Sequence, residues 1–303
     1  MSLLIEETLN ANNNFCEEIN NIINRHNNFK NRKTYNGNYS DFDSNQLYLF
    51  YRGQNDYNWP LSPSINRPLK RDNRSEEEIL NEYKNIEKNA NLGINELIAS
   101  AQHNGLVTRS IDFTSNLKVA LFFAVYNIKK KETNNMDSAL FICLYSPHKI
   151  NWISSTAINL ISLMNEKELT NKELASLLLK NEEFVKLNRN RHNYEIDKTC
   201  SDIASWLNSG FMVVYDYANE EKNMRLKKQE GALFYCGSSF YDGDILCNEI
   251  HDYSPNLNFY KIKLHKINNP DWIEDLCIKI KIPKRLNEKI YKEIGITKET
   301  LGL

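Results

Sequence analysis

The sequence lacks the features that mark membrane proteins and strongly basic nucleic-acid-binding proteins. No stretch of the 303 residues approaches the ~18–20 consecutive apolar residues that a membrane-spanning helix needs. The 38 Lys and Arg residues nearly balance the 39 Asp and Glu residues, so no global basic field attracts nucleic acid or an anionic membrane. The first residues include neither a basic region nor a long apolar region, which predicts no secretory signal.

Cysteine motifs are absent as well. The six cysteines form no C-x-x-C pair and are irregularly spaced, which argues against a structural zinc site and against a disulfide framework. We therefore expect reduced thiols, a cytoplasmic location and no bound metal. The sequence also contains no P-loop, no nucleophile elbow and no G-x-G-x-x-G motif.

The composition is that of a folded globular protein, with 41% apolar, 25% charged and 11% aromatic residues. There is no internal repeat and no linker rich in Pro, Gly or Ser. The sequence predicts a single mixed α+β domain with a central β-sheet over residues 45–303. Residues 1–44 are expected to form a helical N-terminal lead.

Hydrophobic periodicity and turn residues predict the main elements. Helices are expected within 3–29, over 75–101 with Ser75 as N-cap, over 116–128 with Ser115 available as N-cap, as two helices within 155–190, and over 284–294 before Gly295. Strands are expected at 47–53, 139–145, 211–215, 259–264 and 277–282, within 226–236, and in short form within 106–113.

The first candidate site segment is Tyr51-Arg52-Gly53-Gln54, at the end of the strand predicted over 47–53. An arginine at a strand exit suits bidentate contact with phosphate or carboxylate, and Gly53 would let the backbone approach a ligand closely. The alternative is that Arg52 pairs with a structural acid.

The second segment, residues 102–115, concentrates polar side chains beside a buried helix. Thr114 and Ser115 stand at a helix start, where they could bind an anion or simply cap the helix. His103 could act as a general base, as a ribose-binding donor or as a structural residue. Arg109 and Asp112 could form an internal salt bridge.

The third segment runs from Arg225 to Phe234 and joins a basic stretch to an apolar strand. Glu230 beside these cations would stay ionised, and an ionised carboxylate near a sugar can stabilise an oxocarbenium-like centre. The alternative is a surface strand with alternating charge.

Taken together and in this order, the three segments resemble the FRG domain family, which is named for its Phe/Tyr-Arg-Gly motif. The resemblance spans about residues 45–301, so the expected domain over 45–303 is FRG-like. The residues that carry it are Tyr51-Arg52-Gly53-Gln54, Gln102-His103, Thr108-Arg109, Asp112, Thr114-Ser115, Ala124, Arg225, Gln229, Gly231, Phe234, Ile282-Pro283, Gly295-Ile296 and Leu301.

The layout is also similar to that of ADP-ribosyltransferases, with a split sheet expected. The resemblance implies Arg52 on the pyrophosphate of NAD, Thr114-Ser115 on the nicotinamide ribose, and Gln229 or Glu230 on its 2′-hydroxyl. The other implied NAD-binding residues are Tyr51, Gly53, Gln54, His103, Thr108, Arg109 and Asp112. The sequence departs from the transferase pattern in having Gly231 where a glutamate is usual.

The implied function is cleavage of NAD as an ADP-ribosyltransferase or NAD glycohydrolase, with NAD as substrate and a macromolecular acceptor of unknown kind. A bacterial toxin or phage-defence role, with a possible antitoxin partner, is what the resemblance suggests. The alternatives are a non-catalytic module that binds a nucleotide or a nucleic-acid end, and a structural or interaction protein.

Overall fold

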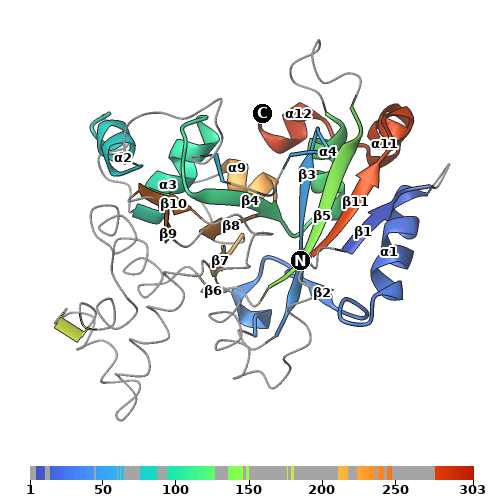
Figure 1. Ribbon diagram of the computed structural model, residues 1–303, viewed down its shortest axis with the longest axis horizontal. Coiled ribbons are helices and arrows are strands. Elements are labelled where there is room, and N and C mark those ends of the chain that lie inside the picture. The colour runs from blue at the N-terminus through green and yellow to red at the C-terminus, as the bar shows by residue number, and fades with distance from the viewer. Residues whose placement is uncertain are drawn as a thin grey trace.

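The computed structural model describes residues 5–10, 14–43, 46–59, 61, 63–64, 76–86, 94–126, 136–145, 148–149, 176, 179–180, 211–217, 224–235, 238–241, 244–247 and 277–303. Within these residues helices lie against a central β-sheet, which confirms the predicted mixed α+β fold (Figure 1). The helices and strands predicted at 155–190 and 259–264 fall largely outside the described residues, as does Ser75.

Nine of the described strands form one sheet in the order β1-β11-β5-β3-β4-β8-β7-β6, with β2 added beside β3. Their bounds are β1 Ile5–Thr8, β2 Lys33–Thr34, β3 Tyr48–Gln54, β4 Ser110–Thr114, β5 Ser138–Tyr145, β6 His148–Lys149, β7 Phe211–Val214, β8 Gly231–Tyr235 and β11 Cys277–Ile282. A separate hairpin pairs β9 (Ser238–Tyr241) with β10 (Asp244–Cys247).

The sheet is nearly divided between β3 and β4. Strand β3 pairs with β5 along its whole length, Tyr48–Gln54, and strand β4 pairs with β8 along its whole length, Ser110–Thr114. The pairing between β3 and β4 consists of one residue pair, Tyr51 with Thr114. In Figure 1, β4 accordingly runs across β3 instead of beside it, and the sheet has two halves that meet at this pair.

The helices are α1 (Phe15–Arg25), α2 (Glu76–Lys84), α3 (Ile94–His103), α4 (Leu117–Val125), α9 (Met224–Lys228), α11 (Asn287–Ile294) and α12 (Lys298–Leu301), with 3-10 turns η1 (Tyr39–Asp41) and η7 (Lys284–Leu286). Helix α1 buries one stripe, as its i, i+4, i+7 spacing of Phe15, Ile19 and Ile22 predicts. Helix α4 is apolar apart from the exposed Lys118 in its first turn, and it packs between β3 and α11. Gly295 ends α11 in the left-handed conformation with φ 65°, as predicted.

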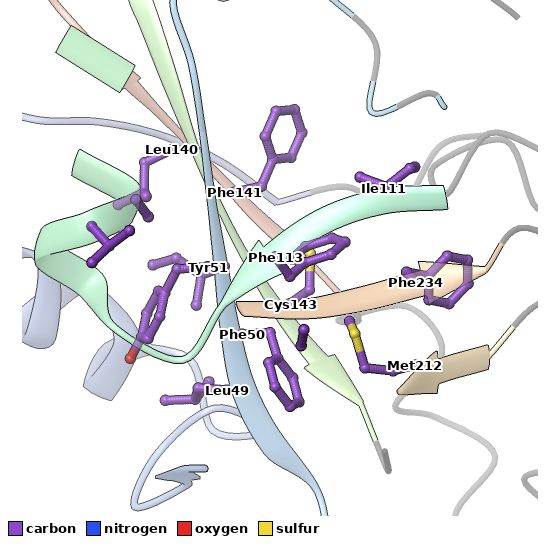
Figure 2. Packing of buried hydrophobic residues seen from close by; sticks show 14 of the residues in the cluster. Leu49, Phe50, Tyr51, Ile111, Phe113, Leu140, Phe141, Cys143, Met212 and Phe234 are labelled. Carbon is purple, nitrogen blue, oxygen red and sulfur yellow. The ribbon is translucent and has the colours of Figure 1, made fainter. Parts of the chain in front are cut away.

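Aromatic side chains join the cores of the two halves. The Tyr145 ring, from β5, lies 6.1 Å from the Phe113 ring of β4 and 5.1 Å from the Phe234 ring of β8, measured between centroids. Phe50 of β3 is fully buried in the same apolar cluster (Figure 2). Because this cluster draws side chains from both halves, it holds them together despite the single backbone pair.

Gly53 is required by packing within the protein. A Cβ atom at this position would overlap the carbonyl oxygen of Ala120 and the amide nitrogen of Ala124, both in the backbone of α4. The close approach that the sequence led us to expect at Gly53 is therefore to helix α4, although Gly53 also lines a cavity described below.

Three local predictions were wrong. The N-cap of α4 is Asn116, whose side chain accepts a hydrogen bond from Lys118 N at 3.0 Å, and Ser115 precedes the cap. Residues 75–101 contain two helices, α2 and α3, instead of one. Within the helix predicted in 3–29, Ile5–Thr8 instead forms strand β1, because it pairs with Ile278–Lys281 of β11, far away in the sequence.

Candidate functional site

A cavity of about 220 Å³ lies where β3 and β4 diverge. It is bounded by the end of β3, the start of α4, the end of α3, strand β4 and the segment from α9 to β8. The residues from the three predicted site segments that line it are Tyr51, Arg52, Gly53, Gln54, Gln102, His103, Asp112, Phe113, Thr114, Arg225 and Gln229. The structure thus brings together side chains that are almost 180 residues apart in the sequence.

Arg52 connects the two halves of the sheet at this cavity. Arg52 lies between Tyr51 and Gly53 in β3, and it is half-buried. The Arg52 Nη1 atom donates a hydrogen bond of 2.6 Å to the backbone carbonyl of Asp112 on β4. The guanidinium is therefore held across the divide between the strands, with its positive charge at the cavity.

Asp112 and Arg225 add a carboxylate and a second guanidinium to the lining. Arg225 lies in α9, and its Nη1 atom donates a hydrogen bond of 2.8 Å to the carbonyl of His103 at the end of α3. Burial lowers the pKa of Arg225, and the negative charge of Asp112 opposes that shift. The cavity therefore contains cationic groups from both sides together with one acidic side chain.

Thr114 and Gln229 hold neighbouring elements of the site together through hydrogen bonds. The Thr114 hydroxyl donates to the carbonyl oxygen of Gln229 at 2.7 Å and accepts from the backbone N–H of Asn116 at 3.0 Å. The Gln229 Nε2 atom donates to the carbonyl of Leu301 at 3.3 Å, which ties α12 to the site. These bonds connect the end of β4, the start of α4 and the turn before β8.

A second cavity, of about 1020 Å³, lies on the other side of the Tyr51–Thr114 pair. Tyr51 lines both cavities, and burial raises the pKa of its hydroxyl above the ordinary value. Ser115, Asn116 and Glu230 line this larger cavity and not the smaller one.

The Glu230 carboxylate holds the start of α4. Its Oε1 atom accepts a hydrogen bond of 2.7 Å from Asn116 Nδ2, and its Oε2 atom accepts one of 3.5 Å from the Ser115 hydroxyl. The Ser115 backbone N–H donates to the Glu230 carbonyl at 3.0 Å. Glu230 adopts φ 46°, which is unfavourable for a residue with a side chain. The predicted catalytic residues are therefore divided: Arg52, Thr114 and Gln229 at the smaller cavity, Ser115 and Glu230 at the larger one.

Thr108 and Arg109, which were predicted to contact NAD, are buried and line neither of these cavities. The Thr108 hydroxyl donates to Gln102 Oε1, as does the hydroxyl of Ser110, and the Thr108 backbone N–H donates to Ser64 Oγ at 2.9 Å. This network connects the end of α3 to the beginning of β4, which gives Thr108 a structural role next to the site.

Gln102 and Arg225 lay within the predicted site segments but were assigned no role in binding or catalysis, and Asn55 and Trp59 were not selected. All four line the smaller cavity. For Arg225 a signal was available, because it precedes Gln229 by four residues and neighbours it on one face if that stretch is helical. The prediction of a strand within 226–236 hid this relation, since residues 224–228 form α9. Trp59 is 42% exposed at the rim, and its sequence context contained no corresponding signal.

Comparison with known families supports the first two of the three site segments. Residues 48–133 match the sequence model of the FRG domain family. This segment is an FRG domain. The matched residues include β3, β4 and α4, and hence the first two site segments, whereas the third, residues 225–234, follows the matched range. No curated protein and no solved structure matches the chain.

Two further classes of feature are absent from the described residues. None of its described helices is long and apolar enough to cross a membrane. The described residues also contain no group of three or more His, Cys, Asp or Glu side chains that could hold a metal ion.

Proposed function

We propose that the FRG domain and the strands that complete it cleave the nicotinamide–ribose bond of NAD and transfer ADP-ribose to a macromolecule or to water. The observation that carries this proposal is that Arg52, Thr114 and Gln229, from three separate motifs, line one cavity. They belong to, or immediately precede, strands that are neighbours in the order β3-β4-β8. The resemblance to ADP-ribosyltransferases implies that these same three residues contact one NAD molecule.

The size of the cavity supports binding of one end of the dinucleotide. Pockets that enclose a drug-sized ligand measure about 300–1,000 Å³, so 220 Å³ suits a ribose with its adjacent groups better than a complete NAD molecule. The guanidinium groups of Arg52 and Arg225 provide charge-assisted donors for a phosphate oxygen. Trp59 at the rim offers an aromatic surface to the part of the ligand that extends outside.

The chemistry asks little of the protein in the way of proton transfer. When the bond between the ribose C1′ and the nicotinamide nitrogen breaks, its electron pair neutralises the positive charge of the leaving group. The site has to position NAD and stabilise the positive charge that develops on the sugar. An acceptor oxygen or nitrogen then bonds to C1′ and releases a proton.

The test is to incubate the purified protein with NAD and measure nicotinamide release and label transfer from adenylate-labelled NAD. In Arg52→Ala, loss of a charge-assisted hydrogen bond worth about 1.5–3 kcal/mol should lower kcat/KM about 10- to 150-fold. The control is Arg285→Ala, since Arg285 is exposed and is not among the residues that line the cavity. Absence of nicotinamide release and of a labelled acceptor from the wild-type protein would refute the proposal.

A binding module without chemistry is the second candidate, and one observation favours it. Gly231 stands where transferases usually have a glutamate, and a Cβ atom there would lie 2.6 Å from Leu226 Cδ1. The same cavity would then recognise a nucleotide or a nucleic-acid end. Calorimetry that detects saturable NAD binding, weakened by Arg52→Ala and unaccompanied by nicotinamide release, would support this candidate over the enzyme.

We further propose that the reaction serves a bacterial toxin or phage-defence role in the cytoplasm, where NAD is available, under the control of an antitoxin partner. This proposal rests on the transferase layout. Induced expression should then slow bacterial growth, and Arg52→Ala should relieve the effect at equal protein level. Equal growth inhibition by the two proteins would contradict it.

A further inference from the structure

One side chain in the smaller cavity has an unsatisfied acceptor. Asp112 lies in β4 between the buried residues Ile111 and Phe113, and alternation along the strand puts its side chain on the face opposite theirs. The Oδ1 atom of Asp112 is shielded from solvent and accepts no hydrogen bond from any residue that the structure describes. A shielded carboxylate oxygen without a donor is costly, so this atom calls for a ligand.

The cavity also contains a donor in the same condition. The Nε atom of Arg225 is shielded and has no hydrogen-bond partner within the described part of the chain. Both residues line the same space of about 220 Å³. A hydroxyl group can donate to a carboxylate and accept from a guanidinium at once. The pair therefore fits the hydroxyls of a sugar ring.

Glu230, the other acid near the motifs, is engaged elsewhere. Its two carboxylate oxygens accept hydrogen bonds from Asn116 Nδ2 and the Ser115 hydroxyl, and the residue lines the larger cavity. Among the described residues that line the smaller cavity, Asp112 is the one with a carboxylate. The acid available to a sugar bound beside Arg52 is thus Asp112.

We propose that the Asp112 carboxylate takes the place of the missing glutamate and contacts the nicotinamide ribose of NAD as the catalytic acid-bearing residue. This inference rests on the function proposed above. As the C1′–nitrogen bond breaks and its electron pair leaves with neutral nicotinamide, the negative charge of Asp112 stabilises the cationic sugar. Water or another acceptor bonds to C1′, and its proton passes to solvent. The carboxylate is unchanged at the end of the cycle.

The experiment compares two isosteric amide variants, Asp112→Asn and Glu230→Gln, in the full-length chain. Removing one electrostatic contact made in the transition state lowers kcat about 10²–10³-fold. We expect this loss in Asp112→Asn, with KM changed less than kcat. Glu230→Gln should keep most of the wild-type kcat, because the amide oxygen of Gln can still accept from Asn116. Thermal melting checks that both variants fold, and Asp112→Glu, which restores a carboxylate, should recover part of the lost rate.

The outcomes separate the two proposals. Wild-type protein that releases no nicotinamide from NAD refutes the proposed function and the catalytic role of Asp112 together. Active wild-type protein with a fully active Asp112→Asn variant refutes the role of Asp112 alone. Loss of kcat in Glu230→Gln, with Asp112→Asn active, would assign the carboxylate to the larger cavity. Should Asp112→Asn not fold, a folded Asp112→Glu variant that keeps measurable kcat supports the assignment, and one that is inactive opposes it.

Discussion

Replacing Gly53 with alanine tests the packing that positions the Tyr-Arg-Gly motif. The added methyl group would overlap backbone atoms of Ala120 and Ala124, and a helix backbone cannot move aside as a flexible side chain can. Overpacking in a core costs about 1–3 kcal/mol and occasionally more, and the rigid obstacle puts Gly53→Ala at about 3 kcal/mol or above. For a chain of this size that corresponds to a fall in Tm of about 6 °C or more, measurable by circular dichroism.

Gly105→Ala is the matched control. Gly105 has φ 82°, and an added Cβ atom would meet no atom within 4 Å, so this variant has backbone strain without a collision. Left-handed backbone costs a residue with a side chain about 1 kcal/mol. If Gly53→Ala unfolds at the same urea concentration as Gly105→Ala or later, the close approach of β3 to α4 is wrong.

Three other predictions follow from contacts described above. Asn116→Ala should lower the free energy of unfolding by about 2 kcal/mol, because it removes the helix cap and the hydrogen bond to Glu230. Ser115→Ala should lower it by less in the same urea titration. A larger loss of stability in Ser115→Ala than in Asn116→Ala would restore Ser115 as the cap. The hydrogen bond from Lys281 holds the pKa of Asp137 below its ordinary value. The contribution of Asp137 to stability is therefore present above about pH 3.9 and disappears as the pH falls through the lowered pKa. Asp137→Asn should flatten the acid side of a stability–pH curve, and an unchanged slope would contradict this. Burial and the neighbouring thiol raise the pKa of Cys143. Iodoacetamide at pH 8 should therefore label Cys143 in urea-unfolded protein but not in native protein. Rapid labelling of the native protein would show that strand β5 is open at Cys143.

Apolar runs in the sequence correctly predicted the buried strand and the buried helix beside the site. The apolar run that ends at Gly53 is strand β3, and the apolar run of α4 is a buried helix. Strand β1 could not be predicted in this way, because Ile5–Thr8 becomes a strand by pairing with β11, more than 250 residues later. The short helix α9 was missed for another reason: a strand was predicted within 226–236, although the Met, Arg, Leu and Lys residues that make up α9 all favour a helix.

The sequence predicted which segments form the site, but not which cavity each of their side chains lines. That Arg52, Asp112 and Gln229 share a cavity agrees with the sequence-based grouping of the three segments. Ser115 and Glu230 are adjacent in sequence to Thr114 and Gln229 but line the other cavity. Both lie just outside the strands, Ser115 after β4 and Glu230 in the turn before β8 at φ 46°, where strand alternation does not set the direction of a side chain. Periodicity indicates which residues share a face only where the ends of an element are known. Here the predicted strand ended at residue 113 and the predicted helix began at 116, whereas β4 ends at Thr114 and α4 begins at Leu117.

The single pair of Tyr51 with Thr114 gives the divided sheet a mechanical property. A ligand held by Arg52 on one half and by Asp112 and Gln229 on the other spans a seam that the backbone closes at one point. Its binding energy therefore adds to the forces that keep the halves in register, and a ligand present at 100 times its Kd would stabilise the folded chain by about 2.7 kcal/mol. We expect the segments beside the seam, β3 and β4, to gain the most protection from amide hydrogen exchange when the cavity is filled.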